Sequence, residues 1–350
     1  MSELRWRLAG DTGGQGVFFA DEELVERHVG RGEYHGVEFL HVNARRIVNE
    51  VPKASRVPFR WTINAYRGCS HACVYCFARP THEYLGLGMG DDFDRKLVVK
   101  VNAVERLRAE LASPRWGGDH IAMGTNTDPY QRCEARYHLT RGIVRVLGDA
   151  ANPFSILTKS TLILRDLDVL AEAAARTTVR ANLSIGTLDE AVWRATEPGM
   201  PHPRRRVEAV ARLRAAGIDC GVLVAPVLPA VSDSPEQLAE VVDACVAAGA
   251  VSVTALPLHL RPGVREHFMS WLGSHRPELV ADYERRYRRA YLPRRDQEEV
   301  VGEVRRLVAA ARARHGGPPR PPRSGPPPPA PAVPPGPEPA APAAQLTLGW

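Results

Sequence analysis

Between residues 60 and 260 the chain alternates short β-rich runs with amphipathic helical stretches, and this order constrains the fold more than any other feature. Parallel strands need long crossover connections, which are usually helices, so the alternation predicts βα units around a parallel sheet. Six runs have the composition of strands: residues 61–66, 120–125, 154–158, 179–186, 220–228 and 251–256. A complete barrel has eight strands. We therefore predict an α/β fold, a partial parallel (β/α)6 barrel of the TIM type, with a doubly wound sheet as the alternative.

The residues outside this repeat form three further segments. Residues 1–59 lack the alternation and are expected to form an N-terminal extension that covers one mouth or edge of the barrel at residues 60–261. Residues 262–317 favour a C-terminal helical segment. Residues 318–350 contain 14 of the 30 prolines. Such a segment cannot build a packed core, so we expect a disordered Pro-rich tail.

Helical spacing is clearest at residues 97–112 and 205–216, and the second of these has an apolar stripe beside a basic face. Residues 283–289 place arginines on a further helix, with tyrosines four positions apart. A solvated basic face over packed tyrosines is the expected arrangement, and contact with nucleic acid is the alternative.

Composition excludes several classes of protein. The chain has 46 Lys and Arg against 40 Asp and Glu and is 44% hydrophobic, as expected of a globular protein rather than a disordered one. Its longest apolar stretches span about 10 residues, short of the ~20 that cross a bilayer, and no signal peptide is evident at the N-terminus. We expect a cytoplasmic protein without a membrane partner. The excess positive charge is spread along the chain, so nucleic acid is a candidate partner that the charge alone does not require.

Three of the six cysteines, Cys69, Cys73 and Cys76, follow the first predicted strand with the spacing C-x3-C-x2-C. Thiolates this close in sequence can converge on one metal centre. A zinc site needs four ligands, and its cysteines usually come as two separate pairs, but no second pair is present. Three thiolates on a four-iron cluster would leave one iron free to bind a small molecule. The spacing favours this cluster, with zinc as the alternative.

This loop, with Tyr75 directly before its last cysteine, resembles the signature of radical S-adenosylmethionine (SAM) enzymes. The resemblance implies a [4Fe-4S] cluster on the three cysteines, whose open iron binds the amino and carboxylate groups of SAM. It also implies reductive cleavage of SAM to a 5′-deoxyadenosyl radical that abstracts hydrogen from a substrate. An electron donor of the flavodoxin or ferredoxin type is the expected partner. The sequence does not indicate the oligomeric state.

Further strings are similar to the spore photoproduct lyase branch, also described as DNA-repair-photolyase-like. They are NAYRGC at 64–69, ARPTHEYLG at 78–86, GTNTDPY at 124–130, LTKS at 157–160 and VAP at 224–226. Several fall at the carboxyl ends of predicted strands, where parallel barrels carry their sites. The resemblance assigns cofactor binding to these positions: Tyr75 near the adenine, Gly124, Thr125, Asn126 and Thr127 at the amino group, Lys159 at the carboxylate, and Ser184 as a hydroxyl contact. Local turn chemistry is the alternative for the loop positions.

One position departs from that branch. Spore photoproduct lyase has a cysteine at the end of the second strand that returns hydrogen to the substrate radical, but here the sequence reads MGTN at 123–126. Cys133 is the nearest candidate for a catalytic thiol, and a buried structural cysteine is its alternative. The branch implies a carbon-carbon lyase acting on a DNA photoproduct. Radical modification of a peptide or small metabolite, or a non-catalytic nucleic-acid-binding module organised by the metal, are the other hypotheses.

Two further residues near the cysteine loop have open roles. His71 lies inside the loop and is expected to face solvent. Asp128 is either a turn cap or a contact for substrate or proton.

Overall fold

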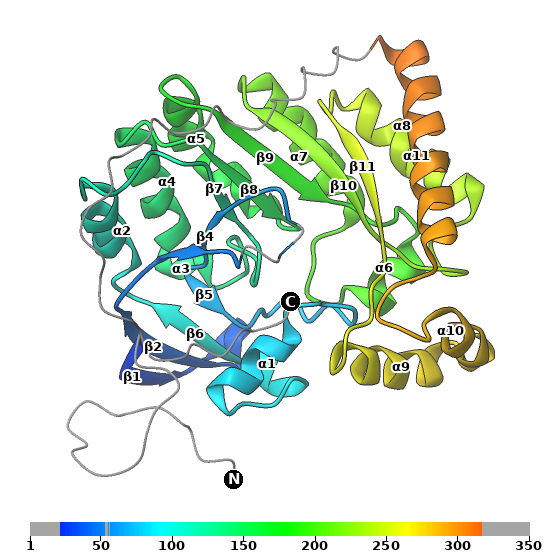
Figure 1. The fold of residues 1–350 in the computed structure, drawn as a ribbon, viewed down its shortest axis with the longest axis horizontal. Coiled ribbons are helices and arrows are strands. Elements are labelled where there is room, and N and C mark those ends of the chain that lie inside the picture. The colour runs from blue at the N-terminus through cyan, green and yellow to red at the C-terminus, as the bar shows by residue number, and fades with distance from the viewer. Residues whose placement is uncertain (1–21, 53–54, 56, 317–350) are drawn as a thin grey trace, which may run out of the picture.

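The computed structural model describes residues 22–52, 55 and 57–316. The predicted disordered tail, like the first 21 residues, lies outside the described residues. Two sheets organise the described residues (Figure 1). The larger has the order β11-β10-β9-β8-β7-β4-β3, and the smaller has the order β1-β2-β6-β5.

The larger sheet confirms the predicted partial barrel. Its six parallel strands are β4 (Trp61–Ile63), β7 (Ile121–Met123), β8 (Phe154–Thr158), β9 (Val179–Ser184), β10 (Asp219–Val227) and β11 (Val253–Pro257). Each strand lies beside the one that precedes it in the series. A doubly wound sheet would instead reverse the strand order at a switch point, so the sequential order favours the barrel. An antiparallel strand, β3 (Val48–Glu50), extends the edge at β4.

Helices connect the parallel strands (Figure 1). They are α2 (Ala103–Leu111), α3 (Glu134–Tyr137), α4 (Leu139–Asp149), α5 (Leu167–Ala174), α6 (Glu190–Thr196), α7 (Pro203–Ala215) and α8 (Pro235–Ala247), with the 3-10 turn η3 (Thr161–Asp166). Fully buried residues of the strands, such as Ile156 and Leu183, share one hydrophobic core with helical residues such as Val144 and Leu213.

The smaller sheet joins the N-terminal residues to the barrel. It consists of β1 (Glu22–Val29), β2 (Glu38–Ala44), β6 (Lys96–Lys100) and β5 (Tyr66–Arg67). The turn η1 (Gly32–Tyr34) links β1 to β2, and η2 (Arg79–Leu85) and α1 (Asp91–Arg95) precede β6.

The single helix expected at residues 97–112 is wrong at its start, because residues 96–100 form β6 and the helix begins at Ala103. The run from Leu97 to Val99 is fully buried, and β6 pairs with β2 on one side and β5 on the other. Neighbouring strands therefore override the helical spacing.

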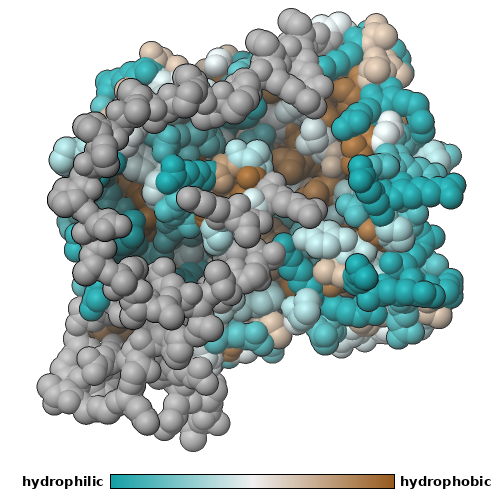
Figure 2. Space-filling model, viewed as in Figure 1, coloured by the Kyte–Doolittle hydropathy of each residue, from teal (hydrophilic) through white to brown (hydrophobic). Residues whose placement is uncertain are grey.

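The C-terminal segment is helical as expected, with α9 (Val264–His275), η4 (Pro277–Leu279), α10 (Val280–Arg286) and α11 (Arg294–His315). Tyr283 and Tyr287 are fully buried, and their hydroxyls donate to the carbonyls of Pro229 and Leu258. The packed-tyrosine prediction is confirmed. Figure 2 shows mostly hydrophilic surface over these helices, and hydrophobic surface near β10 and β11. Among the described residues, no helix is both long and apolar enough to cross a membrane.

Candidate active site

The cysteine loop begins where β5 ends, at a glycine. Gly68 has φ +75°, and a Cβ there would lie 2.8 Å from the His82 ring and from the Phe93 carbonyl. Another residue is therefore excluded by both conformation and space. Cys69 N–H donates to the Phe93 carbonyl at 2.9 Å. The start of the loop is thus held against α1.

The segment after β7 also holds the start of the loop. The Gly68 carbonyl accepts hydrogen bonds from Thr127 Oγ1 at 2.7 Å and Gln131 Nε2 at 3.1 Å. Gln131 Oε1 accepts from the backbone N–H of Ser70 at 3.1 Å. Thr127 and Gln131 are both buried. These fixed bonds hold the loop rigid beside the carboxyl end of the sheet, the rim where barrel enzymes carry their chemistry.

The three loop cysteines are free thiols grouped at this rim. Burial raises the pKa of Cys69, Cys73 and Cys76, and the neighbouring thiols raise the pKa of Cys69 and Cys73 further. The three thiols belong to one loop of eight residues. Thiolates in such a place need a cation, so the donor set fits a metal centre.

The glycine-rich turn after β7 approaches the next strand closely. Gly124 has φ +88°, and a Cβ there would lie 2.0 Å from the Leu157 carbonyl oxygen, so only glycine fits. Asn64 fixes the following residues, because its Oδ1 accepts from Asn126 N–H at 3.1 Å and its Nδ2 donates to Thr125 Oγ1 at 3.1 Å. The predicted residues Gly124–Thr127 therefore form one rigid turn that contacts the cysteine loop through Thr127.

Lys159, which follows β8, and Ser184, at the end of β9, are in contact. Lys159 Nζ donates to Ser184 Oγ at 2.9 Å, to Glu197 Oε1 at 2.9 Å and to the Ala225 carbonyl at 3.1 Å. The same ammonium lies 5.3 Å from the centre of the Tyr75 ring. Ser184 and Tyr75 therefore lie around the Lys159 ammonium, and these three residues proposed for cofactor binding lie together beside the cysteine loop.

Glu197 connects this group to a second cation. Its carboxylate accepts from the Tyr75 hydroxyl and pairs with the Arg206 guanidinium, and both Glu197 and Arg206 are almost completely buried. Burial alone would raise the pKa of Glu197, but Arg206 and Lys159 hold it well below its usual range. One carboxylate thus faces two cations, so this buried centre keeps a net positive charge that suits an anionic ligand group.

Asp128 links the cysteine loop to β8. Its carboxylate accepts from Thr158 Oγ1 at 2.6 Å and from the Lys159 backbone N–H at 2.7 Å, and His71 Nδ1 lies 3.5 Å away. Burial alone would raise the pKa of Asp128, but His71 and these donors lower it. The expectation that His71 faces solvent is wrong, because the ring is only 3% exposed and is drawn inward by this carboxylate.

Cys133 is not brought together with the other site residues. It is fully buried in the main hydrophobic core, and burial raises its pKa well above the usual range. Its neighbours in that core include Tyr66 and Tyr130, whereas the three loop cysteines belong to other clusters. This environment matches the structural alternative for Cys133.

Glu197 and Arg206 were missed by the sequence reasoning. Arg206 lies three and four positions from the buried Ala209 and Val210, and thus on the apolar stripe of α7 rather than on its basic face. An arginine at such a position needs a buried carboxylate partner. That periodicity was the available signal, but it did not identify Glu197 as the partner.

Comparison with known proteins agrees with this geometry. A family model of the radical SAM superfamily matches residues 63–243, and the chain belongs to this superfamily. Members use a [4Fe-4S] cluster and SAM, which are the cofactors of this chain. The cysteine loop, with three free thiols in eight residues, is the part that fits the cluster.

Relatives were found by sequence and by structure. Uncharacterized proteins of Mycobacterium bovis and Mycobacterium tuberculosis are each 47% identical over 297 residues, which is 85% of this chain and 87% of theirs. A solved spore photoproduct lyase complexed with dinucleoside spore photoproduct aligns with a TM-score of 0.58 and 14% identity, over 78% of this chain and 79% of that one. A mutant with bound AdoMet and the same dinucleoside aligns with a TM-score of 0.56 and 16% identity, over 74% and 76%. These structures share the fold.

Proposed function

We propose that this chain is a radical SAM lyase that starts hydrogen abstraction on a damaged nucleic acid, with a dinucleotide photoproduct as the first substrate class to test. When bound, the cluster and SAM supply reductive cleavage of the cofactor and an organic radical. The observation that carries the proposal is the placement of Lys159, Ser184 and Tyr75 around one buried charge centre, at the same rim as the three cysteines.

The residues of this centre have separate tasks. Lys159 is the proposed ammonium for the carboxylate of SAM, which would replace one of the three acceptors that the ammonium now contacts, and Ser184 is the proposed hydroxyl beside it. Glu197 is a positioning residue, because it fixes the Lys159 ammonium and the Tyr75 hydroxyl at once. The turn at Gly124–Thr127 is the proposed site for the amino group, since its backbone is already rigid and lies beside the loop through Thr127.

The substrate class is supported by fold neighbours whose structures contain the photoproduct dinucleoside. The basic composition, with a net charge of +6, is compatible with a polyanionic substrate. The return of hydrogen must differ from that of the lyase branch, because MGTN replaces the expected strand-end cysteine and Cys133 is buried in the core. An electron donor of the flavodoxin or ferredoxin type is the expected protein partner.

The test is an anaerobic reaction with dithionite, SAM and ultraviolet-irradiated oligonucleotide. Lesion loss that depends on SAM, and 5′-deoxyadenosine release that rises when irradiated rather than intact DNA is added, would support the proposal. Release of 5′-deoxyadenosine without any change in the lesion would reject the nucleic-acid substrate and direct the search to peptides and small metabolites. A steep fall of DNA affinity with salt would independently support the polyanionic substrate.

A further inference from the structure

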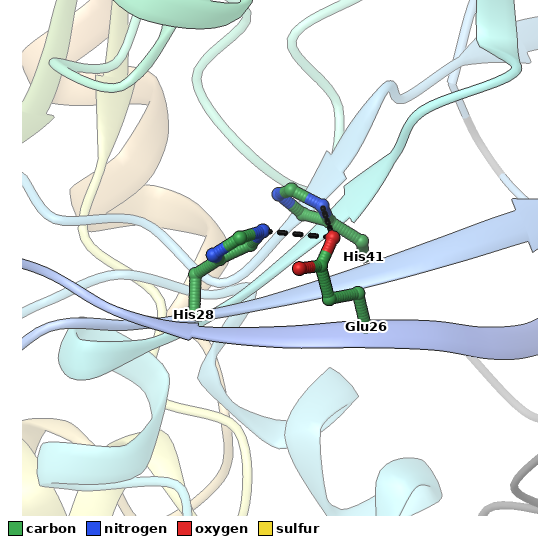
Figure 3. A group of neighbouring side chains, drawn as sticks. All are labelled: Glu26, His28 and His41. Atoms are coloured by element: carbon green, nitrogen blue, oxygen red, sulfur yellow. Dashed lines mark ion pairs between the residues drawn. The ribbon is translucent and has the colours of Figure 1, made fainter.

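A second group of metal-type ligands lies outside the cysteine loop, in the smaller sheet. Glu26 and His28 on β1 and His41 on β2 point toward one another (Figure 3). Their ligand atoms all lie within 4.8 Å of one another. β2 and β6 separate β1 from β5, the strand that leads into the cysteine loop. The two groups therefore occupy opposite edges of this sheet.

An irregularity in β1 creates the group. Leu24 is opposite Val42, and both belong to an apolar cluster on one face of the sheet with Leu40. The register shifts between Leu24 and Glu26, so that Glu26 is opposite His41, on the other face. A β-bulge inserts one extra residue and re-aims the side chains that follow it. Without this bulge Glu26 would share the apolar face with Leu24.

The distances suit a single ion. Glu26 Oε2 lies 2.9 Å from His28 Nε2 and 3.8 Å from His41 Nδ1. Ligand bonds of 2.0–2.1 Å in a tetrahedral zinc site place neighbouring ligand atoms about 3.3 Å apart. The two separations lie on either side of that value, so small side-chain movements would bring all three atoms to an ion.

The second ring nitrogen of His41 also has a hydrogen-bond partner, as is usual for metal-binding histidines. His41 Nε2 lies 2.7 Å from the Tyr137 hydroxyl, so the ring is held with Nδ1 directed at Glu26. The His28 and His41 rings are 4.5 Å apart between centres, and the Tyr137 ring meets His41 edge-on. A partner on the second ring nitrogen fixes the orientation and tautomer of a ligating histidine.

We propose that Glu26, His28 and His41 bind a divalent transition-metal ion of the zinc type, independently of the cysteine loop. Two imidazoles and one carboxylate are ligands that Zn²⁺ accepts, and three protein ligands leave a position open for water. Glu26 is 57% exposed, so an ion can reach the group from solvent. The neighbouring Arg27 is paired with Glu38 and does not occupy the Glu26 carboxylate in this arrangement. A bound ion would tie β1 to β2.

The test uses the full chain with its iron-sulfur cluster assembled anaerobically, washed with chelator and titrated with Zn²⁺ by calorimetry. We expect one zinc per chain beyond the cluster iron. His28→Ala and His41→Ala should remove this binding, and Glu26→Gln should weaken it at least about tenfold by removing the anionic ligand. His35→Ala, an exposed histidine in the same part of the chain, is the matched control and should bind like the wild type.

Co²⁺ replaces Zn²⁺ in a second measurement that reports the ligands directly. Nitrogen and oxygen ligands give visible d–d bands without a thiolate charge-transfer band. The wild type and His35→Ala should show these bands, and His41→Ala should lose them while circular dichroism and iron content stay unchanged. Absence of zinc beyond the cluster, unchanged affinity in all three variants, or a thiolate band would each overturn the proposal.

Discussion

The two metal-type regions of this molecule differ in the distance along the chain that each one spans. The cysteine loop takes three thiols from eight consecutive residues, of which two are buried and Cys76 is partly buried. The histidine group takes its ligands from two strands and leaves them partly exposed, with their ligand atoms within 4.8 Å of one another. Soft sulfur ligands suit an iron cluster, and nitrogen and oxygen ligands suit a single ion. The comparison teaches that a metal site formed by one loop can be predicted from residue spacing in the sequence. A site formed by pairing of two strands cannot be predicted in this way.

The largest expected effect is loss of the cluster when one cysteine of the loop is replaced. Cys73→Ser should lose the cluster and reduce 5′-deoxyadenosine release to background, because only two loop thiolates remain. The iron content and product of purified protein are the measurements. Cys133→Ala is the matched control, since that thiol is buried in the core and should leave both unchanged. His41→Ala should also leave both unchanged, and a loss of cluster there would break the comparison.

The next effect concerns the buried charge centre on the cysteine side. Glu197→Gln leaves Arg206 and Lys159 without their shared carboxylate, so the free energy of unfolding should fall by about 3–5 kcal/mol. Urea unfolding of the cluster-free chain measures this. Glu190→Gln, which breaks an exposed ion pair with Arg194, should change the free energy by no more than about 0.5 kcal/mol. Equal effects in the two variants would contradict the role given to Glu197.

A smaller effect is expected at the proposed carboxylate contact. Lys159→Met keeps much of the side-chain length but removes the ammonium, so the affinity for SAM should fall about 10- to 100-fold, as for loss of a charged hydrogen bond. Equilibrium binding of SAM to the cluster-loaded protein measures this. Lys96→Met, at a partly exposed ion pair with Asp92, is the control. Zinc binding should be the same in both variants, and wild-type SAM affinity in Lys159→Met would remove the residue from the site.

The smallest effect is a pH dependence behind the cysteine loop. Burial lowers the pKa of His82 from 6.5 to about 4. The folded state therefore binds fewer protons than the unfolded state between these values, and stability falls as the pH drops through this window. From pH 7 to pH 5 the histidine should account for about 2 kcal/mol of lost stability.

His82→Gln should show a correspondingly smaller loss of stability between pH 7 and pH 5 in urea unfolding. The exposed His275→Gln is the control and should keep the wild-type dependence. If the His82 and His275 variants give the same pH profile as the wild type, burial of His82 does not contribute as described.

Much of the barrel could be predicted from local patterns. The strand at residues 154–158 matches β8 at both ends, and all six predicted runs overlap a parallel strand. The start of β6 could not be predicted from helical spacing, because its partners β2 and β5 come from distant parts of the sequence. Pairing with strands distant in sequence makes this segment a strand rather than a helix.

The candidate site also contains residues that the sequence predicts and residues that depend on long-range contacts. The cysteines could be chosen by their loop spacing, whereas Lys159 and Ser184 were chosen by the resemblance together with their places after predicted strands. Glu197 could not, since its importance depends on a fold that brings Lys159, 38 positions away, against it. The histidine group depends on a one-residue bulge that reverses which face Glu26 occupies. No local pattern predicts that reversal.

The most direct test of the central claim is the reaction of the anaerobically purified protein with dithionite and SAM, with 5′-deoxyadenosine quantified against bound iron and sulfide. The account predicts about four iron and four sulfide atoms per chain on the cysteine loop, and 5′-deoxyadenosine that is absent from Cys73→Ser. Zinc in place of iron and sulfide, or a loaded cluster whose product never exceeds that of Cys73→Ser, would contradict it.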